Sequence, residues 1–457
     1  MEGLEISEVI LSDVRAKNRI DAECYRKYNL YLNYVIDSYN HQSISEFANV
    51  TDGEHGSPDL DENSGILYLS GHNVKDNVLD LTDIRYCSEE LHNKNKRSAL
   101  TKDSVLLSIV GTVGNASVVY QDIKANTDRN VATIKNISKF VNPYYLSTYL
   151  NSKFGKYQTR LLSTGNVQPL LNLLQVKSIV VCLPNNAFQN HVEQIVKTAH
   201  SDLQQSKSLY FEAEEMLLSE LGLKDWQPNN NPFNIKQLKE SFLVSGRLDA
   251  EYYQSKYDEI EKIIKTHRYD ILDNLCLLIN HGMQPPYVEN GGMRVFSQKW
   301  IKDKEIDYSF IEDINEPRTS MEFAHSNPDY VCRKNDIVHY SVGANIGYCH
   351  TYLSNVPMMP GSFITLIRAN EDKINPIYLG VVLNSIIGRI QSEKRKSGTA
   401  QPYVYPKDIK EFLIPILPKP IQDTISAKIR ESFALKAESK RLLNKAKMMV
   451  ESEIEKG

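Results

Sequence analysis

The chain contains two long stretches in which apolar residues recur at almost every third or fourth position. One stretch runs from Phe188 to Leu221, and the other runs from Ile421 to Ile454. This spacing predicts one apolar stripe along each of two long helices. About 35 residues at 1.5 Å each would make a rod of roughly 50 Å. Because a helix with one apolar stripe needs a partner, we expect the two helices to pair, most simply as an antiparallel coiled coil.

Elsewhere the hydrophobic pattern shortens to β-branched and alternating runs that are typical of strands. These runs lie at 104–110, 116–120, 131–134, 337–342 and 363–367. A helix is predicted after each Asn-Pro pair, at Pro143 and at Pro376, because proline is well tolerated in the first turn of a helix. The predicted fold class is therefore α+β, with several short strands in each half of the chain.

The same pattern occurs twice in the chain. The segment Arg19-Ile-Asp-Ala-Glu-Cys-Tyr25 recurs as Arg247-Leu-Asp-Ala-Glu-Tyr-Tyr253, with five of the seven positions identical. Further matches follow in the same order: 65–74 with 292–301, 103–111 with 335–343, 142–152 with 375–385, and 165–169 with 398–402. A repeat unit of this length is too long for a solenoid, so the chain is predicted to hold two copies of one domain.

The repeats and the helical stripes together predict the domain organisation. The Asn- and Pro-rich stretch from Trp226 to Phe233 is typical of a linker. The predicted divisions are a first domain at 1–185, a helix at 186–225, the linker at 226–233, a second domain at 234–419 and a C-terminal helix at 420–457.

Composition excludes several classes of protein. The 457 residues include 53 Lys and Arg against 57 Asp and Glu, so the net charge is −4, and 41% of the residues are hydrophobic. These values are those of an ordinary globular protein and not of a disordered chain, a collagen-like fibre or a membrane bundle. The first residues, MEGLEISEVI, lack the basic region of a signal peptide. Six scattered cysteines without a Cys-x-x-Cys pair favour a reducing cytoplasm over a zinc site or a disulfide framework.

No segment carries a recognisable catalytic pattern. Asn142-Pro-Tyr-Tyr145 is close to the Asn-Pro-Pro-Tyr loop of adenine methyltransferases, but it lacks the second proline and recurs as Asn375-Pro-Ile-Tyr378 at a predicted helix start. Gly111-Thr-Val-Gly114 is too short for a dinucleotide or adenosylmethionine loop. The acids of Pro58-Asp59 and Pro328-Asp329 precede no Glu-x-Lys and are interpreted as turn residues. We therefore expect no catalytic residue, no metal site and no bound cofactor in this chain.

Basic residues form three clusters that are candidates for contact with DNA phosphates. They are Lys94, Lys96 and Arg97; Lys153, Lys156 and Arg160; and Arg389, Lys394, Arg395 and Lys396. The third cluster is the repeat counterpart of the second, and this recurrence favours phosphate contact. A solvated helix face accounts for the same residues, so both interpretations stay open.

Two polar loops are candidates for reading base edges. The first holds Ser70, His72 and Asn73, and the second holds Gln298 and Lys299. Such side chains present donors and acceptors that match the edges of bases in the major groove. They would equally suit plain junctions between strands and loops. The scaffold repeats while these loops differ, and this pattern fits two modules that read two different sequences.

These features together resemble the specificity subunit of a type I restriction–modification enzyme. The resemblance depends on the paired Arg-Ile/Leu-Asp-Ala-Glu openings, the segment 103–114, the two Gly-x-x-Gln-Pro turns, and the strand-to-helix passages at 179–184 and 412–418. It implies two target-recognition domains, at 19–184 and 247–418, which each read one half of a split sequence in double-stranded DNA. It also implies that the helices at 186–222 and 420–455 form an antiparallel coiled coil.

The resemblance further implies partner subunits. In that family the helices dock methyltransferase subunits that carry adenosylmethionine and methylate adenine, and a separate motor subunit adds restriction. Ala187-Phe-Gln-Asn190 and Pro420-Ile-Gln-Asp423 depart from the usual start of these helices. The departure leaves open a related two-subunit modification system. Two different roles also stay open: a scaffold that binds protein and not DNA, and an enzyme with a diverged site.

Overall fold

The computed structural model describes residues 5–12, 14, 20–165, 168–229, 231, 233–398 and 400–456. Contacts divide the chain into two compact units. Unit 1 comprises Met1–Gln204 with Lys436–Gly457, and unit 2 comprises Gln205–Leu435. Some residues of the predicted motifs lie outside the described residues: Arg19 of the first opening, Asn166, Val167 and Thr399 of the Gly-x-x-Gln-Pro turns, and Asn230 and Pro232 of the linker.

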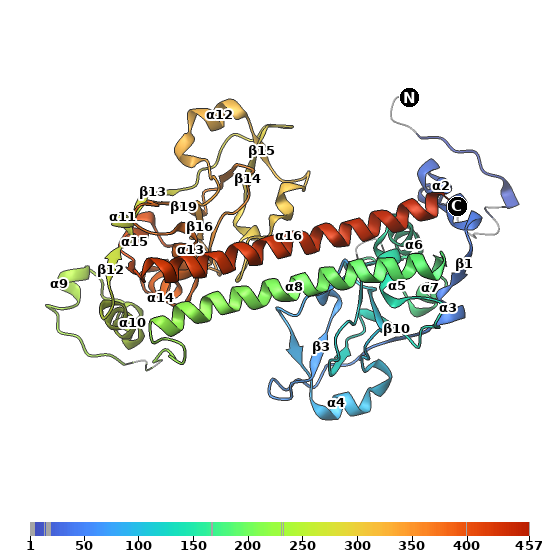
Figure 1. Cartoon of the computed structure of the whole chain (residues 1–457), viewed down its shortest axis with the longest axis horizontal. Helices are drawn as coiled ribbons and strands as arrows, with labels where there is room; N and C mark the ends of the chain where they lie inside the picture. Colours follow the sequence, from blue (N-terminus) through green and yellow to red (C-terminus); the bar gives the residue numbers. More distant parts are fainter. Residues whose placement is uncertain are drawn as a thin grey trace. The chain divides into compact units, whose positions relative to one another are not determined.

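Unit 1 is built on small antiparallel and mixed sheets (Figure 1). The largest has the order β2 (Asn49–Asp52), β10 (Val131–Lys135), β7 (Val105–Ser108) and β8 (Ala116–Val118). The others are β6 (Arg85–Tyr86), β3 (Leu67–Leu69) and β9 (Ala125–Thr127); β1 (His41–Ser43) with β11 (Val180–Cys182); and β4 (Val74–Lys75) with β5 (Val78–Leu79). The β-branched runs predicted at 104–110, 116–120 and 131–134 are confirmed as strands.

Short helices connect the strands of unit 1. They are η1 (Ala22–Tyr25), α2 (Lys27–Ser38), α3 (Ile44–Phe47), η2 (Gly71–Asn73), α4 (Glu89–Lys94), η3 (Lys96–Ser98), α5 (Pro143–Asn151), α6 (Lys153–Leu162) and α7 (Leu173–Lys177). The helix predicted after Asn142 is confirmed as α5. Asn142 Oδ1 accepts a hydrogen bond from Tyr144 N at 2.9 Å, and Pro143 occupies the first turn, where its missing N–H leaves no bond unmade.

Unit 2 repeats the strand orders of unit 1. Its largest sheet has the order β13 (Cys276–His281), β19 (Ile364–Ala369), β16 (Ile337–Tyr340) and β17 (Cys349–Thr351). The others are β15 (Arg318–Thr319), β14 (Met293–Phe296) and β18 (Met358–Pro360); and β12 (Tyr269–Ile271) with β20 (Leu413–Pro415). In each three-stranded sheet the central strand has one parallel and one antiparallel neighbour. The repeat seen in the sequence therefore corresponds to the same strand orders in both units, except that the β4–β5 pair is reduced in unit 2 to a single bridge between Ile301 and Ile306.

The short helices of unit 2 follow the same plan. They are α9 (Phe242–Ser245), η4 (Ala250–Tyr253), α10 (Ser255–Lys265), α11 (Leu272–Leu275), η5 (Gln298–Trp300), η6 (Tyr308–Ile311), α12 (Met321–Ser326), η7 (Pro328–Tyr330), α13 (Pro376–Asn384), α14 (Ile386–Arg395) and α15 (Pro406–Lys410). Asn375 caps α13 as Asn142 caps α5, with Ile377 N at 3.0 Å from Asn375 Oδ1.

The repeat extends to buried side-chain hydrogen bonds. Gln158 on α6 donates to Val180 O at 2.8 Å and accepts from Val180 N at 2.8 Å. Gln391 on α14 donates to Leu413 O at 3.0 Å and accepts from Leu413 N at 2.6 Å. In each unit the amide thus bonds the outward-facing N–H and C=O of a strand in a two-stranded sheet, groups that the sheet itself leaves without partners.

The two predicted long helices are confirmed as α8 (Asn186–Glu220) and α16 (Lys419–Lys456), drawn in green and red in Figure 1. Parts of both helices belong to each unit. In unit 1, Val192 and Val196 of α8 join one apolar core with Ala446 and Val450 of α16. In unit 2 the core includes Ala213, Leu217 and Leu221 of α8 with Ile425 of α16. Burial of their apolar stripes therefore stabilises both helices.

Candidate nucleic-acid interface

The basic side chains of α6 are engaged within unit 1. The ion pairs are Lys153 with Glu455, Lys156 with Asp76 at 2.9 Å, and Arg160 with Glu23 at 3.3 Å. Lys156 Nζ also donates to Asn115 Oδ1 at 2.6 Å. Each of these cations would have to leave a carboxylate to reach a phosphate. Their contact with DNA stays a prediction, and their role in the structure is to hold α6 against its neighbours.

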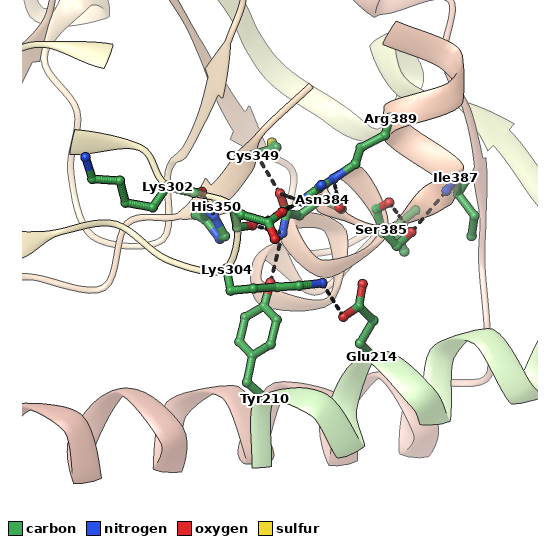
Figure 2. Close-up of polar contacts among 12 residues, drawn as sticks. Tyr210, Glu214, Lys302, Lys304, Cys349, His350, Asn384, Ser385, Ile387 and Arg389 are labelled. Carbon is green, nitrogen blue, oxygen red and sulfur yellow. Dashed lines mark hydrogen bonds and ion pairs between the residues drawn. The ribbon is translucent and has the colours of Figure 1, made fainter. Parts of the chain in front are cut away.

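Arg389 on α14 is engaged in the corresponding way in unit 2. Its guanidinium donates to Asn384 O at 2.7 Å and to Asp303 O at 3.0 Å, and it also binds the Asp303 carboxylate. Figure 2 shows that Asn384 connects this cluster to Tyr210 of α8, whose hydroxyl oxygen accepts from Asn384 Nδ2 at 2.9 Å. Lys304 Nζ and Glu214 form an ion pair beside it at 2.7 Å. Arg389 thus fastens α14 to the loop that precedes η6.

Two of the other three basic residues in this cluster, Lys394 and Arg395, also have partners within unit 2. Lys394 pairs with Glu261 of α10, and only 12% of the Lys394 side chain is exposed. The Arg395 guanidinium lies 5.4 Å from the centre of the Phe412 ring and donates to Glu411 O at 3.2 Å. Lys396 is half-buried, and its side chain forms no ion pair with a described residue.

The predicted loop at Ser70–Asn73 is a closed turn. Ser70 N donates to Asn73 Oδ1 at 2.9 Å, and Asn73 Nδ2 donates to Asp80 O at 2.8 Å. Asn73 is 1% exposed, so its amide holds the turn and is not presented to a base. His72 is exposed, with Nδ1 at 3.1 Å from Ser70 Oγ. Of the three predicted residues, His72 alone projects from the surface.

The second predicted loop surrounds a buried carboxylate. Glu316 accepts a hydrogen bond from Trp300 Nε1 at 2.9 Å and pairs with Lys299, while its own side chain is only 2% exposed. Lys299 therefore neutralises Glu316, which would be costly to bury without a partner. Gln298 is half-buried and its Oε1 has no hydrogen-bond partner among the described residues. Neither side chain is an exposed, unengaged donor.

The cluster on α4 and η3 differs from the other two because two of its cations are both exposed and without an ion pair among the described residues. Lys94 and Lys96 lie at the surface, and neither forms an ion pair with a described residue. Arg97 is 61% exposed, with Nη2 at 3.7 Å from Asp52 Oδ1. Lys94 and Lys96 are therefore available to an anion, and Arg97 is restrained only by this longer contact with Asp52.

Two further basic residues lie at the same place, and no sequence pattern selected them for DNA contact. His55 is exposed in the loop after β2, with Nε2 at 2.7 Å from Asp52 Oδ2. Arg129 is exposed in the turn between β9 and β10, and its backbone N–H donates to Glu54 O at 3.0 Å. We call the set His55, Lys94, Lys96, Arg97 and Arg129 the basic surface. Their proximity arises from tertiary contacts, so no local pattern could have indicated it.

Close packing fixes the loop that carries His55. A Cβ atom on Gly53 would lie 1.8 Å from Thr127 O, so only glycine allows β2 to pass this close to β9. Glu54 N donates to Thr127 O at 3.1 Å, and the Glu54 carboxylate accepts from the Asn95 amide between α4 and η3. Through these bonds the loop, the α4–η3 connection and the Arg129 turn are joined.

The electrostatic balance of the basic surface is positive. The backbone N–H of Gly56 and the amide of Asn95 lower the pKa of Glu54, so this carboxylate stays ionised. The carboxylates of Asp52, Glu54 and Asp128 at this place face four permanent cations, those of Lys94, Lys96, Arg97 and Arg129. A chain with a net charge of −4 thus carries a local patch that attracts polyanions.

The described part of the chain contains no candidate for a metal site or for a membrane-spanning helix. There, no three His, Cys, Asp or Glu side chains lie close enough together to hold a metal ion. No helix among the described residues is both long and apolar enough to cross a membrane.

Comparison with known proteins supports the family resemblance. No family model matches the chain. Over 208 residues the chain is 27% identical to the type I restriction enzyme EcoBI specificity subunit of Escherichia coli, and the match covers 44% of this chain and 40% of that protein. The matched part is thus less than half the length of the curated relative. The resemblance to type I specificity subunits that the motifs predicted is confirmed as a similarity in sequence.

Solved structures of the same kind were also found. The type I restriction–modification S subunit from M. genitalium is 12% identical, with 91% of this chain and 95% of that chain covered, at a TM-score of 0.46. The HsdS subunit from Thermoanaerobacter tengcongensis is 15% identical, with 90% and 95% covered, at a TM-score of 0.28. At these scores the two structures add no weight to the assignment.

Proposed function

We propose that this chain is the DNA-specificity subunit of a type I restriction–modification complex. The observation that carries the proposal is the similarity over 208 residues to the EcoBI specificity subunit. The repeated topology of the two units supports it, because one scaffold used twice suits a protein that reads a DNA site in two halves. The basic surface of unit 1 adds a place where DNA phosphates would bind.

In this proposal residues 1–185 and 234–419 are the two target-recognition domains, and residues 226–233 link them. Each domain reads one half of a bipartite sequence. Helices α8 and α16 pair as an antiparallel coiled coil. In unit 2, Ser206 contacts Ser432 and Glu212 contacts Lys428, so the residue numbers of the two helices run in opposite directions.

The proposal includes partner subunits that supply the chemistry. The long helices would dock adenine methyltransferase subunits, which would carry adenosylmethionine, and a restriction subunit would join the same complex. The specificity subunit of a related two-subunit modification system is an alternative with the same recognition role. A protein-binding scaffold is the alternative of a different class.

A methylation map tests the proposed function. The chain would be co-expressed with the methyltransferase encoded beside it, and the host DNA would be sequenced for modified adenine. We expect methylation of a split motif with a fixed gap, and its loss when this chain is omitted. Replacing residues 19–184 with the corresponding domain of a relative should change one half of the motif only. Absence of new methylation, with both proteins soluble and associated, would refute the proposal and favour a scaffold.

A further inference from the structure

The two units can be compared position by position, because the same backbone hydrogen bonds occur in both. Glu54 N donates to Thr127 O in unit 1, and Met283 N donates to Pro360 O in unit 2, both at 3.1 Å. Glu54 is therefore equivalent to Met283, and the next residue, His55, is equivalent to Gln284. The close passage of β2 recurs as well, since a Cβ atom on Gly282 would lie 2.4 Å from Pro360 O.

The turn that carries Arg129 has an equally clear counterpart. Asp128 N donates to Leu69 O, and Gly361 N donates to Phe296 O, both at 2.9 Å. Asp128 is therefore equivalent to Gly361, and Arg129 is equivalent to Ser362.

Helices α4 and α12 are matched by their caps. Leu91 N donates to Ser88 Oγ, and Phe323 N donates to Ser320 Oγ, both at 3.1 Å. Each helix is followed by a 3-10 turn, η3 and η7, which begins two residues after the helix ends. The equivalents of Lys94, Lys96 and Arg97 are therefore Ser326, Pro328 and Asp329.

The scaffold is the same at these five positions, but its chemistry changes completely. Unit 1 has His55, Lys94, Lys96, Arg97 and Arg129, whereas unit 2 has Gln284, Ser326, Pro328, Asp329 and Ser362. Four permanent cations are replaced by one carboxylate and no cation. Unit 2 instead exposes aromatic rings near this place, with Tyr287 56% exposed and Phe363, the equivalent of Asn130, 47% exposed. One surface suits phosphates, and the other suits neutral groove edges.

We infer that the two units bind DNA through different kinds of contact. The basic surface of unit 1 binds the phosphate backbone and supplies the salt-dependent part of the affinity, whereas the equivalent surface of unit 2 contacts its half-site through neutral and aromatic groups. This inference rests on the proposed function. Since phosphate contacts position a protein and carry no direct sequence information, the basic surface should set affinity and leave the recognised sequence unchanged.

The test is the salt dependence of DNA binding by the assembled complex. The variant Lys94→Gln/Lys96→Gln/Arg129→Gln removes three cations that form no ion pair with a described residue, and it leaves Arg97 with Asp52. A phosphate contact contributes about 0.9 to the slope of log K against log salt, so three contacts contribute about 2.7. Between about 50 and 200 mM salt, the wild type should therefore lose roughly 40-fold more affinity than the variant.

Two matched variants control for the removal of charge. Lys75→Gln/Lys102→Gln/Lys139→Gln takes three exposed cations from elsewhere in unit 1, and Lys302→Gln/Lys334→Gln/Lys407→Gln takes three from unit 2. We expect both to keep a slope within about 0.5 of the wild type, because a cation that touches no phosphate releases no counterion. The converse variant, Gln284→Lys/Ser326→Lys/Ser362→Lys, should steepen the slope, because it builds the basic surface onto unit 2. Thermal melting of each complex checks that the variants fold.

The outcomes separate this inference from the proposed function. Methylation of a bipartite motif, together with an unchanged slope in the Lys94/Lys96/Arg129 variant, would overturn the inference and leave the proposed function standing. A comparable loss of slope in the unit 2 variant would also overturn it. If no complex methylates or binds a bipartite site, the proposed function itself fails.

Discussion

The hydrogen bonds of the buried Gln391 amide should contribute more to the free energy of unfolding than those of its counterpart, the Gln158 amide. Gln391→Leu keeps the size of the side chain but removes both bonds to Leu413. Gln158→Leu removes both amide bonds to Val180, yet Val180 O keeps the hydroxyl of Tyr149 as a donor at 2.9 Å. The first change therefore orphans two backbone groups and the second orphans one.

The expected cost follows from this difference. A buried backbone group without a partner costs about 1–3 kcal/mol, and the lower part of this range applies where a strand is only partly buried. Leu413 and Val180 are both half-buried. We therefore expect a loss of about 2–4 kcal/mol for Gln391→Leu and about 1–2 kcal/mol for Gln158→Leu.

Hydrogen exchange of the full chain is the suitable assay, because a chain with two units need not unfold in one step. Protection should fall in peptides that cover β20 for Gln391→Leu and in peptides that cover β11 for Gln158→Leu. Gln194→Leu, at an exposed position of α8, is the matched control and should change neither. Equal effects of the two variants, or a larger effect of Gln158→Leu, would refute the reasoning about Tyr149.

Much of the fold was predictable because it depends on local patterns. The stripe along α8 and the Asn-Pro start of α5 lie within single stretches of sequence, and both predictions are confirmed. The three-stranded sheets were not predicted. Strands such as β6 and β15 have two residues each, and two residues show no alternation of apolar and polar positions.

The candidate site was less predictable because it depends on tertiary contacts. Lys94, Lys96 and Arg97 were selected as a run of charge, and they are exposed. Arg129 lies about thirty residues further along, and only the pairing of β9 with β3 and the bond between Arg129 N and Glu54 O bring it to the same place. Conversely, the sequence around Lys156 does not show that its ammonium group forms an ion pair with Asp76, which lies far away along the chain.

Further predictions test particular residues. Lys156→Gln should leave the salt slope of DNA binding unchanged, because Lys156 already binds Asp76 and Asn115; a slope reduced by about 0.9 would contradict this. Gly282→Ala should displace the loop after β13, because its Cβ would lie 2.2 Å from Gly361 O, and protection of β13 from hydrogen exchange should fall while that of β2 stays the same. Burial lowers the pKa of His339 to about 3 and that of His350 to about 4, below the usual 6.5. Between these values and pH 6.5 the unfolded chain therefore binds more protons at these two histidines than the folded chain does. Unit 2 should therefore lose stability as the pH falls from about 6.5 towards 4, and thermal melting of His339→Gln should show a flatter pH dependence in this window.

Side chains that recur at matching positions of the two units are used inside each unit. Recurrence of basic residues on α6 and α14 predicts phosphate contact, yet Lys156 and Arg389 occupy matching positions and each binds a carboxylate of its own unit. The matching amides of Gln158 and Gln391 are likewise used inside each unit. Positions that keep their chemistry in both copies are those on which the scaffold depends, because unsatisfied backbone groups and unpaired buried charges are costly in either copy. An exposed position on which the scaffold does not depend is free to differ, so that one copy can bind phosphates and the other can contact groove edges. The exposed positions where the copies diverge, such as Arg129 and Ser362, are therefore the first places to look for contact with DNA.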